Sequence, residues 1–129
     1  MDGRSLFGAI VRTVGLGYVL FQLYQLIQIV PVLVSGQVPM VNGEVVPGNI
    51  VAQSHQAIQN LLAILTEAGY DARHVVRCGV WLDDPRDFWS FNAVYKSYFG
   101  EHPPARAAVQ SHMMVDCKVE IECVAYKGP

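Results

Sequence analysis

The fold is indicated most clearly by residues 103–126, which read PPARAAVQSHMMVDCKVEIECVAY. This stretch contains two strand patterns, Ala105 to Gln110 and Cys117 to Tyr126, joined by a short connection. In the second strand the residues Val119, Ile121 and Cys123 alternate with Glu120, Glu122 and Val124. Successive side chains of a strand point to opposite faces, so one face is predicted to be apolar and the other to carry the glutamates.

A helix and a strand are predicted upstream. Asn49 is placed as an N-cap and Gly69 as a C-terminal cap. Between them, apolar residues recur at helical spacing: Ile58, Leu61, Leu62, Leu65 and Ala68. His74 to Leu82 is typical of a strand, and its predicted apolar face consists of Val76, Cys78, Val80 and Leu82.

A second helix is predicted to begin at Asp84-Pro85, an acidic cap followed by proline at the first helical position, and to end at Gly100. Its apolar face is predicted to consist of Phe88, Phe91, Tyr95 and Tyr98. The resulting order, strand(s)–helix–strand–helix–strand–strand, predicts an α+β fold in which both helices pack on one face of a sheet.

The N-terminal third has a weaker pattern. Val32 to Ser35 resembles the end of a buried strand, and Asn42-Gly43 predicts a turn. Tyr18 to Val30 fits either one long strand or a helix with a glutamine stripe. Although Arg12 to Glu44 has no internal charge, three glutamines and a proline interrupt the apolar run: Gln22, Gln25, Gln28 and Pro31. We therefore expect neither a membrane span nor a signal peptide.

Length and composition predict one domain, residues 1–129, in which residues 1–31 form a divergent apolar segment. With 52% hydrophobic and 16% charged residues, the chain is expected to be folded and to make subunit contacts. A net charge of −2 without a basic run gives no support to a nucleic-acid partner. The odd number of cysteines, 3, predicts reduced thiols in a cytoplasmic protein, and the 4 scattered histidines show no metal-ligand spacing.

Three positions have residue types suited to chemistry. Arg106 is a charged residue among small ones, and its guanidinium could bind a carboxylate with two parallel hydrogen bonds. Residue types alone favour an ion pair with Glu120 or Glu122 instead. Glu120 could act on water, although charged residues alternating along a strand are more often a solvated face. Ser35-Gly36 could present backbone N–H groups to an anion, or could simply end a strand.

Together these segments resemble the RidA/YjgF family, also called the L-PSP endoribonuclease group. The resemblance covers the chain from about Val34 onward and rests on four segments. They are Val34–Pro39 (VSGQVP), Phe91–Tyr95 (FNAVY), Pro104–Val109 (PARAAV) and Val119–Glu122 (VEIE).

The resemblance implies a chorismate-mutase-like mixed sheet and a homotrimer with a ligand cleft at each subunit interface. It implies that Arg106 binds the carboxylate of a 2-imino or 2-enamino acid and that Glu120 helps activate water. Backbone groups near Gly36, Ser35 and Ala108 would complete the site. The expected hydrolase activity gives a 2-keto acid and ammonia, without a metal or an organic cofactor.

The sequence departs from the family pattern in two places. The family's G-P-Y motif is missing, and Tyr18 or Tyr24 is the alternative site tyrosine. The connection after Arg106 has Met113-Met114 where the family usually has an L-P turn. A deaminase specific to one pathway, such as for 2-aminomuconate, and a non-catalytic trimer that binds small carboxylates therefore remain alternatives to a deaminase of short 2-imino acids.

Overall fold

The computed structural model describes residues 15–23 and 30–128. These residues belong to two compact units, Met1–Val30 with Lys127–Pro129, and Pro31–Tyr126. In the first unit residues 15–23 form a helix whose apolar side chains, including Tyr18, are exposed. The helical alternative therefore holds for residues 18–23, while residues 24–29 lie outside the described part. No described helix has both the length and the apolar character needed to cross a membrane.

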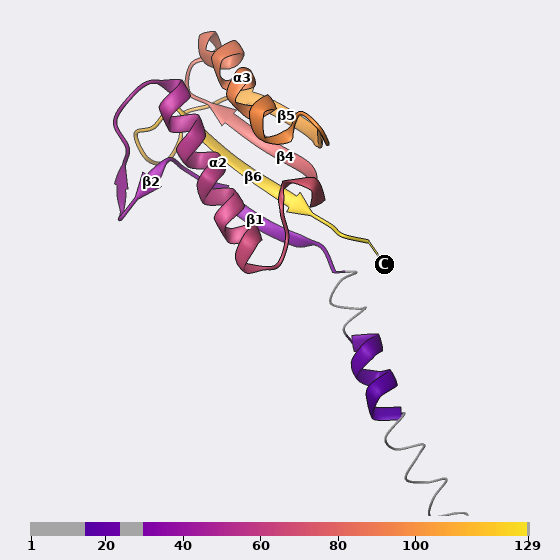
Figure 1. Cartoon of the computed structure of the whole chain (residues 1–129). Coiled ribbons are helices and arrows are strands. Elements are labelled where there is room, and N and C mark those ends of the chain that lie inside the picture. Colours follow the sequence, from indigo (N-terminus) through magenta and orange to yellow (C-terminus); the bar gives the residue numbers. More distant parts are fainter. Residues whose placement is uncertain (1–14, 24–29, 129) are drawn as a thin grey trace, which may run out of the picture. The chain divides into compact units, whose positions relative to one another are not determined.

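The second unit is built on a sheet with the strand order β1-β6-β4-β5. The strands are β1 (Val32–Gln37), β4 (Val75–Leu82), β5 (Ala105–Gln110) and β6 (Val119–Ala125). β4 and β5 are parallel, whereas β6 is antiparallel to both β1 and β4. Helices α2 (Ile50–Glu67) and α3 (Phe88–Phe99) lie on one face of this mixed sheet (Figure 1). The predicted α+β class and the arrangement of helices are confirmed.

Local signals fix the ends of α2. The Asn49 side chain accepts a hydrogen bond from the backbone N–H of Ala52 at 3.1 Å, which confirms the predicted N-cap. Gly69 follows the helix with a φ of 79°, a conformation that glycine adopts without strain. Before the helix, Asn42-Gly43 forms the predicted turn between β2 (Met40–Val41) and β3 (Glu44–Val45).

The predicted apolar face of β4 is wrong at one residue. Val75 pairs with Ala125 and Arg77 with Val124, so the register shifts at Val76. This irregularity turns Val75 into the core and leaves Val76 45% exposed. A strict alternation of inward and outward residues does not predict the extra residue, Val76, that this register shift places in β4. Cys78, Val80 and Leu82 do share the buried face as predicted.

A short 3-10 helix, η2 (Pro85–Asp87), precedes α3, and another, η1 (Ala72–His74), precedes β4. The Asp84 side chain accepts a hydrogen bond from the backbone N–H of Arg86. The predicted acidic cap therefore lies at the start of η2, and α3 begins after it. The buried residues of α3 are Phe91, Val94, Tyr95 and Phe99. Phe88 and Tyr98 of the predicted face are only partly buried and pack against the core from its edge.

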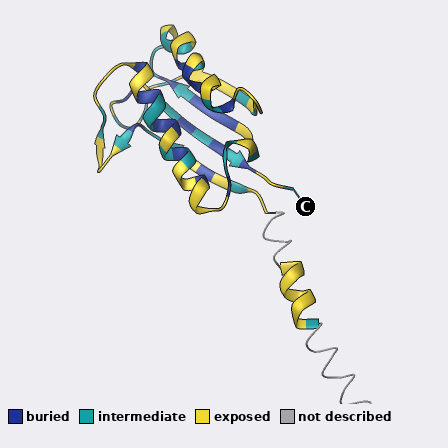
Figure 2. Ribbon diagram, viewed as in Figure 1, coloured by how far each residue is buried: buried dark blue, intermediate teal, exposed yellow. Residues whose placement is uncertain are grey.

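The core lies between the helices and the sheet, as the distribution of buried residues in Figure 2 shows. On β6 every second residue, from Val119 to Ala125, is buried, whereas Glu120 and Glu122 are half-buried on the opposite face. Two large apolar side chains on that face, Leu33 and Val109, are 73% and 51% exposed. Among the described residues of the second unit, helices therefore cover one face of the sheet, and we call the other the open face.

Candidate functional site

Arg106 lies on the edge strand β5, directly beside Cys78 of β4. Cys78 is fully buried under the helices, so paired residues on the same face place the Arg106 side chain on the helix side. There its Nη1 donates to Oδ1 of Asn92 at 2.9 Å. Its guanidinium carbon lies 4.5 Å from the ring centre of Tyr95. Helix α3 therefore supplies both a hydrogen bond and an aromatic surface that orient the guanidinium.

The remaining donors of Arg106 have no carboxylate partner among the described residues. Arg106 lines a cavity of about 290 Å³ between the end of α3 and the start of β5. The other lining residues are Asn92, Tyr95, Lys96, Phe99, Gly100, Pro103 and Pro104. Lys96 is the other charged residue in this set, and it is also positive. A cavity lined by two cations, in a chain of net charge −2, suits an anionic ligand.

The ion pair considered from the sequence, between Arg106 and Glu120 or Glu122, is wrong within one chain. Glu120 pairs with Trp81 and Glu122 with Gly79, both on the open face of the sheet. β6 is also separated from β5 by β4. Arg106 and Glu120 are therefore on opposite faces and on strands that are not neighbours, and a single chain does not bring them together.

Glu120 instead lies against Gly36 of β1. A Cβ at residue 36 would overlap with the Oε1 atom of Glu120 and would come within 2.9 Å of its Cδ atom. The β1–β6 register is irregular between Val34 and Gln37, so Gly36 lies in the irregular part of the strand. The Gln37 side chain donates to the carbonyl of Ser35 at 3.0 Å. Ser35, Gly36 and Glu120 are thus neighbours, whereas Arg106 is not part of this group.

Ala108 lies two residues after Arg106, on the same face of β5, because it pairs with the buried Val80. It lines a separate cavity near the end of the strand. Tyr18 belongs to the first compact unit, and Tyr24 lies outside the described residues, so a role for either tyrosine stays a prediction. The structure thus arranges the predicted site residues of the second unit in two groups, one on each face of the sheet.

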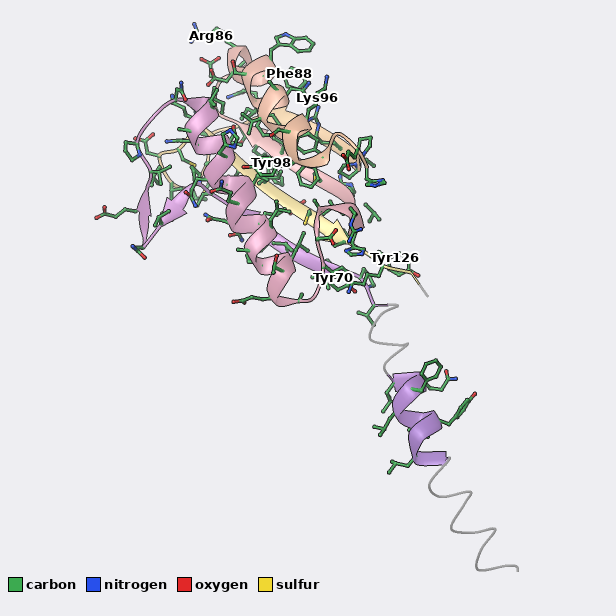
Figure 3. All side chains as sticks on the ribbon, in the orientation of Figure 1. Tyr70, Arg86, Phe88, Lys96, Tyr98 and Tyr126 are labelled. Atoms are coloured by element: carbon green, nitrogen blue, oxygen red, sulfur yellow. The ribbon has the colours of Figure 1, made fainter. Side chains whose placement is uncertain are left out.

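Sequence reasoning missed the residues that surround Arg106. Asn92 and Tyr95 stand within the FNAVY segment, but the spacing of a helix alone did not connect them with β5. Lys96 follows them at an exposed position of α3, where nothing in the sequence distinguishes it from an ordinary surface lysine. Figure 3 labels Lys96 and Phe88, which both project from α3. The link to Arg106 became visible only through the packing of α3 on the sheet.

The cysteines close to this site are poor nucleophiles. Burial raises the pKa of the Cys78 thiol and raises that of Cys123 to about 12. Burial also raises the pKa of the Tyr95 phenol, well above its usual range. These groups stay neutral near pH 7, and a neutral thiol reacts slowly. The charged groups that line the Arg106 cavity are therefore those of Arg106 and Lys96.

The family assignment follows from comparison with known proteins. A sequence model of the family described as Endoribonuclease L-PSP matches residues 25–127. A RutC family protein from Pyrococcus horikoshii is 44% identical over 97 residues, 73% of this chain and 77% of the relative. The 2-iminobutanoate/2-iminopropanoate deaminase of Mus musculus is 43% identical over 101 residues, 76% of this chain and 75% of the relative.

Solved structures agree. The YjgF gene product of E. coli superimposes with a TM-score of 0.70 at 36% identity, covering 75% of this chain and 80% of that one. E. coli TdcF with bound serine gives a TM-score of 0.70 at 34% identity, covering 76% of this chain and 81% of that one. The chain belongs to the RidA/YjgF family, as the resemblance of its motifs predicted.

Proposed function

We propose that this protein is a deaminase that hydrolyses 2-imino and 2-enamino acids to 2-keto acids and ammonia. The observation that supports this most is the Arg106 guanidinium, oriented by Asn92 and Tyr95 and lining a cavity without a partner carboxylate among the described residues. A planar guanidinium binds a carboxylate in a fixed orientation through two parallel hydrogen bonds. The mouse relative named as an imine deaminase supports the reaction. The serine bound by TdcF carries an α-carboxylate and an α-nitrogen, as the proposed substrates do.

The reaction needs one water molecule. Its oxygen adds to C2 of the imine while Glu120 takes the proton that the water loses. Glu120 then returns this proton to the imine nitrogen, which gives a neutral carbinolamine and restores the carboxylate. The carbinolamine then passes a proton to its nitrogen, the C–N bond breaks, and ammonia leaves as the carbonyl forms. A carboxylate in this role typically contributes roughly 10²–10⁴-fold to the rate. Arg106 holds the substrate carboxylate and so fixes C2 relative to the water.

A site that uses both residues requires more than one subunit. Because Arg106 and Glu120 lie on opposite faces of one sheet, we propose that Arg106 of one subunit meets Glu120 of the next, in a homotrimer. The open face of the sheet, with Leu33 73% and Val109 51% exposed, supports such an assembly. The buried free thiols of Cys78, Cys117 and Cys123 are compatible with the cytoplasm, where we place the protein.

The direct test is to generate 2-iminopropanoate or 2-iminobutanoate with an amino-acid oxidase or a dehydratase and to follow loss of the imine. We expect acceleration by the wild type and none by Arg106→Ala. Arg106→Lys keeps the charge but loses the planar fork, so it should restore only part of the activity. Arg73→Ala, which removes an exposed arginine paired with Asp71, is the matched control.

Two results would contradict the proposal. Undiminished turnover in Arg106→Ala would exclude the role of the guanidinium. Binding of 2-ketobutyrate without any acceleration of imine loss would identify a non-catalytic protein that senses small carboxylates. A parallel assay with 2-aminomuconate compares a dicarboxylic substrate with the short imines, and a large preference for it would assign the protein to one catabolic pathway.

A further inference from the structure

A second cavity, of about 260 Å³, lies where the end of β5 meets η2 and the start of α3. It is lined by Leu82, Pro85, Phe88, Trp89, Ala108, Val109 and Gln110. With the exception of Gln110 these side chains are apolar, and none of them is charged. The cavity therefore differs in kind from the one lined by Arg106 and Lys96: it suits an apolar group rather than an anionic one.

Trp89 is the most unusual residue of this cavity because its side chain is 76% exposed. Its ring centre lies 5.1 Å from that of Phe88, at an interplanar angle of 70°, so the two rings form an edge-to-face pair. An exposed indole leaves a large apolar area in water, and contact with a ligand would remove that area. Tryptophan is accordingly enriched among residues that dominate binding energy.

The apolar cavity is separate from the cavity lined by Arg106, but two of its lining residues, Phe88 and Ala108, lie close to Arg106. Phe88 lines the cavity, and its ring centre also lies 5.7 Å from the Arg106 guanidinium carbon. Ala108 lines the cavity two residues after Arg106, on the same face of β5. Such i and i+2 positions are roughly 7 Å apart on a strand. A carboxylate at Arg106 and a branched or aromatic side chain reaching past Ala108 span this separation, whereas a methyl group does not.

The geometry points to a substrate class within the proposed deaminase function, on which this inference rests: 2-imino acids with a large apolar side chain. Arg106 binds the carboxylate, and the cavity beside Ala108 receives the side chain against the rings of Phe88 and Trp89. Trp89 is then a specificity-determining residue. Its contribution grows with the size of the substrate side chain and is smallest for 2-iminopropanoate.

The test compares imines that an amino-acid oxidase forms from alanine, leucine and phenylalanine. For the wild type we expect kcat/KM for the leucine- and phenylalanine-derived imines to exceed that for the alanine-derived imine by roughly 10-fold or more, since each methylene in an apolar pocket adds to discrimination. Trp89→Ala should reduce this ratio by about 10-fold, and Trp89→Phe by less. Val51→Ala, which trims an exposed apolar residue on α2, should leave the ratio unchanged.

An unchanged ratio in Trp89→Ala, or a wild-type preference for the alanine-derived imine, would overturn the inference. If the wild type consumes no imine at all, the proposed function fails, and calorimetry with the 2-keto acids then tests the cavity by itself. Tighter binding of 4-methyl-2-oxopentanoate than of pyruvate, lost in Trp89→Ala, would support the apolar cavity. Equal affinities would overturn it.

Discussion

Gly36 of β1 and Glu120 of β6 lie so close that a Cβ at residue 36 would overlap with the glutamate carboxylate. The constraint is one of space, because Gly36 is not among the glycines with a positive φ. Gly79 of β4 stands in a similar relation to Glu122, whose Oε1 would lie 2.9 Å from a Cβ at residue 79. Each glutamate on the open face of the sheet thus packs against a glycine.

The two glycines provide a matched pair of variants. Gly36→Ala should displace the Glu120 carboxylate and lower kcat by about 10²-fold, if Glu120 acts on the water. Gly79→Ala should displace Glu122 and change the melting temperature, but should reduce kcat far less. Imine turnover and thermal unfolding, measured on both proteins, separate the two effects. Equal losses of kcat would mean that residue 36 matters only for the structure of the sheet.

Asn92 is expected to act through Arg106. Its Oδ1 accepts the 2.9 Å hydrogen bond from Nη1, and a hydrogen bond to a charged group contributes about 1.5–3 kcal/mol. Asn92→Ala should therefore raise KM by roughly 10-fold or more while the fold persists. Asn92→Asp should be worse, because its carboxylate would occupy the guanidinium in place of the substrate. Ser90→Ala, an exposed change on the same helix, is the control; a KM equal to that of Asn92→Ala would contradict the role of Asn92.

Much of the fold followed from local patterns. The alternation in residues 119–125 and the cap at Asn49 each depend on neighbours in the sequence, and the structure confirms both. The exposure of Val76 could not be predicted from such local patterns, because the register shift that causes it depends on the partner strand β6. In the N-terminal unit the residues show no period that separates a strand from a helix, so the helix at 15–23 could not be chosen from the sequence.

The site was predictable residue by residue but not as an arrangement. The spacing within β6 correctly placed Glu120 and Glu122 on one face. It could not reveal that Arg106 lies on the other face, because that depends on which residue of β4 pairs with which residue of β5. For the same reason Lys96 and Asn92 were not connected with Arg106. Strand register and helix packing are tertiary properties, and local spacing does not determine them.

Lys96 is predicted to attract the substrate carboxylate without contributing to the chemical step. It lines the same cavity as Arg106 but is exposed, so its effect is screened by salt. Lys96→Met should raise KM by about 2- to 5-fold at low ionic strength and leave kcat unchanged, and Lys96→Arg should retain most of the affinity. The difference between Lys96→Met and the wild type should shrink in a salt series. A difference that does not depend on salt would point to packing instead of charge.

Asp71 should make the stability of the fold depend on acid. A side-chain hydrogen bond from Arg73 holds the pKa of Asp71 well below its usual range. A lowered pKa in the folded state means that the stabilisation is present above the unfolded-state pKa of about 4. It is lost as the pH falls from there through the folded-state pKa. Asp71→Asn should therefore lower the melting temperature at pH 7, and the difference from the wild type should shrink below about pH 4.

The control for Asp71 is Asp116→Asn, an exposed aspartate in the connection after β5. Its melting temperature should differ little from that of the wild type across the same pH series. A difference between Asp71→Asn and the wild type that stays constant down to pH 2 would contradict the linkage. In that case the effect of the substitution would not come from the ionised carboxylate of Asp71.

Arg106 and Glu120 lie on opposite faces of the sheet. Mixing two kinds of subunit tests whether each active site takes these residues from different subunits. Arg106→Ala and Glu120→Ala should each be inactive alone. If every site takes its arginine from one subunit and its glutamate from the next, any mixed cyclic trimer has one intact site out of three. Random assembly at equal amounts should then restore about a quarter of the wild-type activity, since three quarters of the trimers are mixed. Co-expression with two different affinity tags isolates the mixed trimers for this measurement. Persistent inactivity of isolated mixed trimers would contradict a site that takes its arginine from one subunit and its glutamate from the next.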